Sequence, residues 1–208
     1  MKRIRNARRR FAHWLADVRD HLAKRIKRRR GKLHEHVEEI REEHEHGREF
    51  RMFDSITLDA IPDAPEAVAG YVNGSWPTFA EVKRRWPHAK HLSIAVTSSA
   101  NAECLDVEPG DATPADAPGW VKRQRERGVK RPVIYCSLSM VLPVLKALAA
   151  AGIERHEIRL WTAHYTGTAH RCTPACGLGM PTTADATQFT DHSHGANLDE
   201  SLCSPEFL

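Results

Sequence analysis

The stretch Leu105-Asp106-Val107-Glu108-Pro109-Gly110 predicts the end of a buried strand that carries two carboxylates on one side. The apolar run Leu92-Ser93-Ile94-Ala95-Val96 comes shortly before it, and Pro-Gly closes it as a turn. Residues two apart on a strand face the same side, roughly 6–7 Å apart along the chain, so Asp106 and Glu108 should project together. Two carboxyl groups that cannot both ionise freely supply one acid and one anion. An exposed acidic turn is the alternative for an isolated pair of this kind.

Short strand and helix patterns alternate from residue 51 to residue 208. Strands are expected over residues 52–61, 68–72, 91–97, 103–107, 132–136, 158–164, 184–190 and 197–199, and helices over 64–68, 79–86, 113–128 and 139–151. Because the connections are short, this alternation implies parallel strands in βα units. We predict an α/β fold, a small (β/α) TIM-like barrel with trimmed helices; an open doubly wound sheet is the alternative. No glycine-rich loop follows the first strand, which argues against nucleotide binding.

Residues 1–50 form a segment of different character, which we interpret as a charged amphipathic helix and a linker. Residues 1–32 contain 14 Lys and Arg against two Asp, whereas the net charge of the whole chain is only +4. Apolar residues recur mostly at spacings of three, four or seven, as in a narrow coiled-coil-like seam: Ile4, Phe11, Leu15, Val18, Leu22, Ile26, Leu33, Val37 and Ile40. A helix with so few apolar residues does not fold alone. Residues 1–46 should therefore pack on the domain, self-associate with further copies or an assembly partner, or bind an anionic surface such as nucleic acid or lipid headgroups.

Histidines and cysteines lie in two parts of the chain. A solvated polar face explains the four histidines of the N-terminal segment better than metal binding does: His34, His36, His44 and His46. Cys172 and Cys176 form a short loop pair that would suit a local disulfide in an oxidising medium. A zinc site is disfavoured there because His164 and His170 would have to fold back onto the cysteines. We expect neither a metal nor another cofactor.

Targeting signals are not recognisable in the sequence. No stretch approaches the ~20 apolar residues of a membrane span. The basic start of the chain lacks the apolar region of a secretory signal peptide. The sequence therefore assigns no location to the protein.

Polar and aromatic residues gather near the predicted strand ends. In a barrel the carboxyl ends of the strands converge on one face, where binding and catalytic residues lie. The residues near these ends are Asp106, Glu108, Tyr135, Ser137, His164, Tyr165, Gln188, Asp191 and Asp199. Asp54 lies on the first predicted strand, near its beginning and not its end. Aromatic faces stack on sugar rings and carboxylates act on glycosidic bonds, so this set indicates a carbohydrate site.

The order of these motifs resembles the family 25 glycoside hydrolases, lysozyme-like barrels that cleave peptidoglycan. It is more similar still to the related glycoside-hydrolase-like domains of actinobacteria and their phages. The resemblance covers residues 52–208 and rests on Phe53-Asp54-Ser55, Leu105-Asp106-Val107-Glu108, Tyr135-Cys136-Ser137, Trp161-Thr162-Ala163-His164-Tyr165, Gln188-Phe189-Thr190 and Asn197-Leu198-Asp199. It implies a muramidase-like activity on peptidoglycan or a related glycan. Without a signal peptide, access to a cell wall would depend on a virion, on release at the wall or on another secretion path.

The resemblance also implies roles for individual residues. Glu108 matches the general acid, Asp106 the second carboxylate of the motif, and Asp54 and Asp199 two further acids of the site. Trp161, Tyr165 and Gln188 match positions near the sugar subsites, and Tyr135 is added to them as a substrate-binding candidate. Acidic neighbours should keep Glu108 protonated and leave Asp106 ionised. Asp106 would then either stabilise oxocarbenium-like charge or orient the 2-acetamido group of the substrate.

Several features depart from the pattern. The domain is short, Asp59 competes with Asp54 for the first acidic position, and the Cys172–Cys176 loop and His192-Ser193-His194 have no counterpart in it. These departures support a second hypothesis: a non-catalytic module of a phage virion or cell-surface assembly, with the N-terminal helix as its assembly element.

Overall fold

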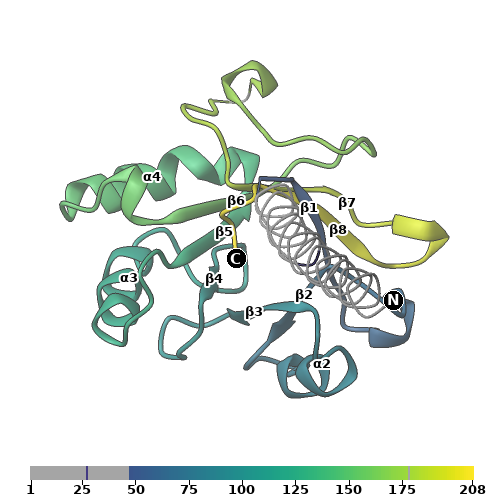
Figure 1. The fold of residues 1–208 in the computed structure, drawn as a ribbon. Helices are drawn as coiled ribbons and strands as arrows, with labels where there is room; N and C mark the ends of the chain where they lie inside the picture. Colours follow the sequence, from purple (N-terminus) through teal and green to yellow (C-terminus); the bar gives the residue numbers. More distant parts are fainter. Residues whose placement is uncertain (1–26, 28–46, 178) are drawn as a thin grey trace, which may run out of the picture. The chain divides into compact units, whose positions relative to one another are not determined.

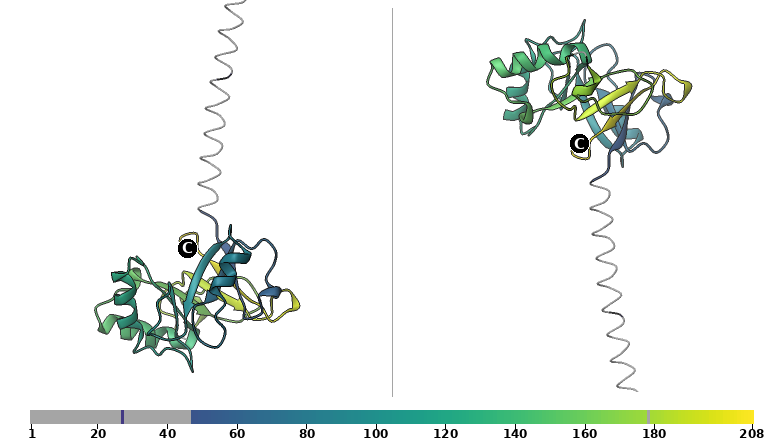
Figure 2. Two further views of the ribbon diagram at one scale, coloured as in Figure 1. Left: turned by 90° about the horizontal axis from the view of Figure 1, so that it is seen from below. Right: turned by 90° about the horizontal axis from the view of Figure 1, so that it is seen from above.

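The computed structural model describes residues 27, 47–177 and 179–208. The helix predicted over residues 1–46 therefore lies, apart from Lys27, outside the described residues. Arg48–Leu208 form one compact unit (Figures 1 and 2). No helix in the described part of the chain is both long and apolar enough to span a membrane.

Eight strands close into a barrel in the order of the sequence. They are β1 (Phe50–Asp54), β2 (Ala67–Tyr71), β3 (Lys90–Ala95), β4 (Cys104–Asp106), β5 (Val133–Ser137), β6 (Arg159–Ala163), β7 (Ala186–Thr190) and β8 (Asp199–Cys203). Strands β1 to β7 pair in parallel, each with the next. The predicted α/β barrel is confirmed, and the open sheet is excluded by the pairing of β8 with β1.

The last strand runs against the others, so the prediction of a fully parallel sheet was wrong. β8 is antiparallel to both β7 and β1. Only residues 191–198 join β7 to β8, too few for the crossover that a parallel connection requires. The reversal carries the first residue of β8, Asp199, to the rim where β1 ends, and Asp199 is the register partner of Asp54.

Within residues 47–177 and 179–208, three α-helices accompany the strands: α2 (Phe79–Arg85), α3 (Ala117–Glu126) and α4 (Val141–Ala150). In Figure 1, α2 lies beside β2 and β3, and α3 and α4 lie beside β4 to β6. The helix expected over 64–68 is absent from the structure, because Ala67 and Val68 are extended and pair with β1. The strand expected over 52–61 ends at Asp54, and the 3₁₀ helix η1 (Leu58–Ala60) follows.

The core follows the two-residue alternation of the strands. One set of side chains fills the barrel, among them Met52, Leu92, Ile94, Trp161 and Phe207. The alternate set packs under α3 and α4, among them Leu105, Ile134 and Leu160. A residue two positions after an inward apolar side chain also points inward. At the rim where β1 and β4 end, these inward residues are polar: Asp54 and Asp106.

Candidate active site

The rim of the barrel gathers the polar residues that the sequence placed at strand ends. Asp54 follows Met52 by two positions, and Asp106 follows Cys104 by two, so both carboxyl groups share the inward side of their strands. Both residues are almost fully buried, at 2% and 4% exposure. The barrel interior is therefore apolar below and acidic at its mouth.

Asp54 and Asp199 form a carboxyl–carboxyl pair across β1 and β8. Burial, followed by the charge of Asp199 and its hydrogen bond, raises the pKa of Asp54 well above its usual range. Burial raises the pKa of Asp199 to about 6, although hydrogen bonds from Gln188 and Asp54 act in the opposite direction. Asp54 is thus the protonated donor of the pair, and Asp199 is the acceptor that carries the charge.

Gln188 connects this pair to two tyrosines. The hydroxyl of Tyr135 donates to Oε1 of Gln188 at 2.6 Å, which leaves the Gln188 amide group to donate to Asp199. The Tyr135 hydroxyl also hydrogen-bonds with that of Tyr165, a residue 54% exposed at the mouth. Gln188 itself is 3% exposed, so it holds Asp199 in place from below and does not present a surface to a ligand.

Asp106, Glu108 and Asp111 form a second acidic group. Burial, then the charges of Glu108 and Asp111, raise the pKa of Asp106 to about 8. Burial, then Asp111 and Asp199, raise the pKa of the half-buried Glu108. The expectation that Asp106 is ionised is therefore wrong for neutral pH: Asp106 is the more deeply buried acid, and no Lys or Arg of the described residues opposes the shift in either pKa.

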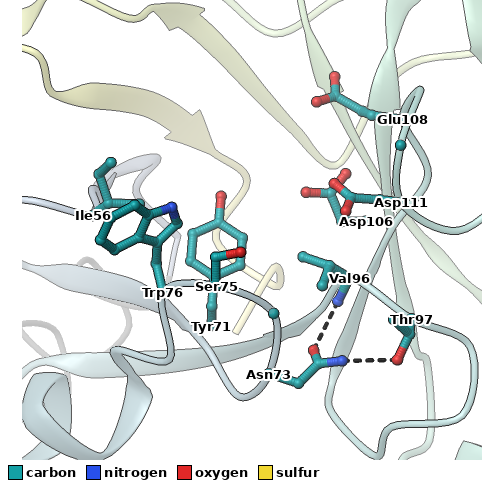
Figure 3. Close-up of a pocket in the computed structure, with 12 residues that line it drawn as sticks. Ile56, Tyr71, Asn73, Ser75, Trp76, Val96, Thr97, Asp106, Glu108 and Asp111 are labelled. Carbon is teal, nitrogen blue, oxygen red and sulfur yellow. Dashed lines mark hydrogen bonds between the residues drawn. The ribbon is translucent and has the colours of Figure 1, made fainter.

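A cavity of about 490 Å³ opens beside these carboxyl groups. Figure 3 shows Asp106, Asp111 and Glu108 on one side of it, and Trp76 with Ile56 on the other. The hydroxyl of Tyr71 points into the space between the two sides. Trp76 is 61% exposed, so one large aromatic face is free to stack on a ligand.

The loop that carries Trp76 is fastened to the next strand by Asn73. Its Oδ1 accepts the backbone N–H of Val96 at 3.0 Å, and its Nδ2 donates to Thr97 Oγ1 at 2.8 Å (Figure 3). Gly74 has φ +84°, a backbone conformation that suits glycine, and the Cβ of another residue would lie 2.9 Å from Val96. Asn73-Gly74 thus builds the turn that aims Trp76 at the mouth.

Sequence reasoning missed three residues of this cavity: Tyr71, Trp76 and Asp111. Tyr71 ends a strand, and the rule that selected Asp106 would have selected it. Trp76 lies five residues beyond that strand in a loop, and no periodicity places a loop residue over a barrel mouth. Asp111 follows the Pro109-Gly110 turn, which folds it back toward Glu108.

Two predicted site residues lie elsewhere. Trp161 is 1% exposed, packs on Tyr135 with ring centroids 4.5 Å apart, and donates its indole N–H to Ser201 at 3.0 Å. It is a core aromatic beneath the mouth, not a stacking platform. Asp59, the rival of Asp54, is exposed and paired with Arg85 on α2, so the structure favours Asp54 as the acid of the first strand.

The remaining strand-end residues take no direct part in the cavity. Ser137 and Ser139 hydroxyls contact each other at 3.2 Å beside the start of η2 (Leu138–Met140). Asp191 pairs with its neighbour His192 at 2.8 Å. His164 turns toward His170 and Cys172, away from the residues that line the cavity.

All five cysteines are free thiols, so the disulfide considered for Cys172 and Cys176 is absent from this structure. Cys104 and Cys136 are buried in strands, as predicted. Among the described residues, the candidate metal ligands form one group made of His164, His170, Cys172 and Cys176. His164 and His170 do fold back onto the two cysteines, an arrangement that the sequence had disfavoured.

Comparison with known proteins supports the barrel as a fold. A crystal structure of an uncharacterized B. stearothermophilus protein is similar over 76% of this chain and 98% of its own, with a TM-score of 0.53 and 14% identity. The Clostridium perfringens spore cortex lytic enzyme SleM is similar over 73% of this chain and 63% of its own, with a TM-score of 0.44 and 16% identity. No family model and no curated protein matches the chain. The first similarity establishes a shared fold and nothing about chemistry, and the second is too distant to bear on either.

The fold and the site together define an α/β barrel with an acidic mouth. Five carboxyl groups, from Asp54, Asp106, Glu108, Asp111 and Asp199, act on one another there.

Proposed function

We propose that this barrel is a glycoside hydrolase-like domain that cleaves peptidoglycan or a related glycan. One observation carries the proposal. The carboxyl groups of Asp106 and Glu108, each with a raised pKa, lie beside an open cavity that also has an exposed tryptophan face. Hydrolysis of a glycosidic bond needs an acid that is still protonated at neutral pH, and a surface that holds a sugar ring.

Glu108 is the proposed general acid. Its carboxyl group lies at the cavity edge and is only half-buried, so it reaches a substrate that the fully buried Asp54 does not reach. Burial, then the charges of Asp111 and Asp199, raise the pKa of Glu108, which favours the protonated form that donates to the leaving glycosidic oxygen. Loss of that proton leaves a carboxylate able to activate a water molecule in a second step.

Asp106 is proposed to stabilise the reacting sugar. In its protonated form it donates a hydrogen bond to the substrate, for example to a 2-acetamido oxygen. In an alternative role, an ionised Asp106 would stabilise the positive charge that develops on the sugar ring, because opposite charges at close range attract. Asp106 lines the cavity together with Glu108, so a sugar bound there lies next to both residues. The raised pKa of Asp106 favours the first role at neutral pH.

The test is release of soluble sugar fragments from purified peptidoglycan by the full chain. Glu108→Gln should abolish release while the protein stays folded. Glu126→Gln is the matched control, because Glu126 is exposed on α3 and far from the cavity residues in sequence. Equal release by wild type and Glu108→Gln would overturn the proposal.

A binding module without hydrolysis is the second candidate. The observation in its favour is the pKa of Asp106, about 8, which makes this acid a hydrogen-bond donor at neutral pH and a poor nucleophile. In this case the domain of residues 51–208 would recognise a glycan, and residues 1–50 would serve as the assembly element. Co-sedimentation of the folded wild type with peptidoglycan, without any release of fragments, would favour this candidate over the hydrolase.

A further inference from the structure

We propose that His164, His170, Cys172 and Cys176 bind a structural Zn²⁺ ion. The proposal is independent of the function proposed for the barrel mouth. One potential ligand atom from each of the four residues lies within 4.8 Å of every other. Two neutral imidazoles and two thiolates are a common ligand set of closed zinc sites, and the two thiolates balance the charge of the ion.

The distances between the donor atoms fit a tetrahedral site. Nδ1 of His164 lies 3.0 Å from Nε2 of His170, and Sγ of Cys172 lies 3.3 Å and 3.6 Å from these two nitrogens. The thiols of Cys172 and Cys176 are also in hydrogen-bond contact. Zn–N bonds of about 2.0–2.1 Å and Zn–S bonds of about 2.3 Å give tetrahedral edges of roughly 3.3–3.8 Å. The three distances among His164, His170 and Cys172 differ from these edges by a few tenths of an ångström, and Cys176 Sγ lies within 4.8 Å of the other three donor atoms.

The surroundings of His170 set the tautomer that a metal requires. Its Nδ1 lies 2.8 Å from the carbonyl oxygen of Thr168, an acceptor, so Nδ1 carries the ring proton. Nε2 is then left with a free lone pair, and Nε2 is the atom that faces the cluster. Ligand histidines usually donate their other ring N–H to such a carbonyl.

Cys172 is held in place from the barrel side. Its side chain is fully buried, and its backbone N–H donates to Oγ1 of the buried Thr187 in β7 at 2.8 Å. His164 follows directly on β6, and its backbone N–H bonds to the carbonyl of Gln188. Two ligands are therefore fixed by the sheet, and His170 and Cys176 come from the loop between β6 and β7.

The ion would stabilise the long loop between β6 and β7. This loop covers residues 164–185, and within its described residues the one regular element is the short 3₁₀ helix η4 (Pro174–Cys176). A loop of this length has little core of its own, and loops beyond about 12–15 residues without regular structure are uncommon. Zinc would cross-link both ends of the segment 164–176. Tyr165, the residue next to the first ligand, hydrogen-bonds with Tyr135 at the mouth, so the ion would also fix one wall of the candidate active site.

Four protein ligands leave no position for water or substrate, so we assign the ion a structural role. The zinc site is also separate from the acidic mouth, since none of the four ligands lines the cavity. Binding converts two thiols to thiolates and releases their protons, and no oxidant or reductant is needed.

The test is cobalt substitution of the full chain, prepared without an affinity tag and under reducing conditions. Co²⁺ bound by two thiolates and two imidazoles gives sulfur-to-cobalt charge-transfer absorption and intense visible bands of a tetrahedral ion. The histidines of the N-terminal segment would not give the charge-transfer band, because that segment contains no cysteine. We expect about one Co²⁺ or Zn²⁺ per chain with this signature.

Variants assign the signature to the four residues. Cys176→Ser and His170→Gln should abolish the charge-transfer band or shift it, whereas His88→Gln, at an exposed site, should leave it unchanged. A folded wild type that shows no thiolate-to-cobalt band would overturn the proposal without reference to any variant. Formation of a Cys172–Cys176 disulfide in the presence of excess Zn²⁺ and reductant would overturn it equally.

Discussion

Asp54 and Asp199 are opposite one another in the register of β1 and β8, although 145 positions separate them in the sequence. The antiparallel direction of β8 produces this relationship, since it returns the first residue of the last strand to the rim where the first strand ends. The two carboxyl groups share a hydrogen bond, and Gln188 and Tyr135 extend it across the barrel. Asp54 and Asp199 thus belong to one bonded network, and the charges of Asp106 and Glu108 act on Asp54 through space.

The stability of the domain should fall as the pH rises from about 4 to about 8. The carboxyl group of Asp106 has its ordinary pKa of 3.8 in the unfolded chain and a pKa of about 8 in the folded domain, so the folded state binds the extra proton between these values. Its contribution is fully present below the lower value and is lost at the upper value, at most about 1.4 kcal/mol per pH unit.

Urea unfolding at several pH values between 4 and 8 measures this effect. Asp106→Asn cannot titrate and should give a flatter dependence of the free energy of unfolding on pH than wild type. Asp59→Asn, at an exposed carboxyl group, should keep the wild-type slope. Equal slopes for wild type and Asp106→Asn would show that Asp106 is not the buried acid described here.

Asp111 should set the alkaline limit of activity. Its charge is the largest cause, after burial, of the raised pKa of Glu108, and it also raises that of Asp106. In Asp111→Asn both pKa values fall, so the general acid loses its proton at lower pH. The descending limb of the pH–rate profile should therefore move to lower pH, and an unmoved limb would contradict this role.

Trp76 should contribute to substrate binding, and little to the stability of the domain or to kcat. Its ring is 61% exposed beside the cavity, so Trp76→Ala should change the free energy of unfolding by no more than about 0.5 kcal/mol. Loss of a stacking surface should raise KM for a soluble glycan roughly tenfold and leave kcat nearly unchanged. Steady-state kinetics on peptidoglycan fragments measures both, and an unaltered KM would remove Trp76 from the site.

Gly70 should be intolerant of a side chain because α2 packs directly on it. A Cβ at this position would lie 3.0 Å from the Phe79 Cα and 3.0 Å from a Val82 methyl group. Gly70→Ala should therefore destabilise the domain by about 1–3 kcal/mol. Gly119→Ala in α3 is the matched control: nothing lies within 4 Å, and a gain of up to about 1 kcal/mol is expected. Thermal unfolding of the two variants should show shifts of opposite sign.

The sequence predicted the barrel because period-two apolar runs alternated with helical ones, and that signal is local. It also predicted Asp106, Glu108 and Asp199 at the rim, since the carboxyl ends of barrel strands converge on one face, whereas Asp54 was selected through the resemblance. In the structure Asp54, Asp106 and Gln188 each lie two positions after an inward residue of the barrel. The resemblance implied a place near the sugar subsites for Trp161, but Trp161 lies in the core beneath the rim.

Features that depend on contacts between distant parts of the chain could not be predicted from local sequence patterns. The direction of β8 depends on the length of one connection, and the alternation of strands and helices alone predicted the opposite. The cluster of His164, His170, Cys172 and Cys176 depends on the path of a loop that has no periodicity. The pKa of Asp106 depends on Asp111, which a turn brings close to it, so a sequence motif of two carboxylates assigned the charges incorrectly.

The central claim is that Glu108 donates a proton to a glycosidic bond. The most direct measurement is the rate at which new reducing ends form in purified peptidoglycan, for wild type, Glu108→Gln and Glu126→Gln at one protein concentration. The account predicts formation of reducing ends by wild type and Glu126→Gln, and a loss of at least about 100-fold in Glu108→Gln. Equal rates in all three proteins, or no new reducing ends from folded wild type, would contradict it.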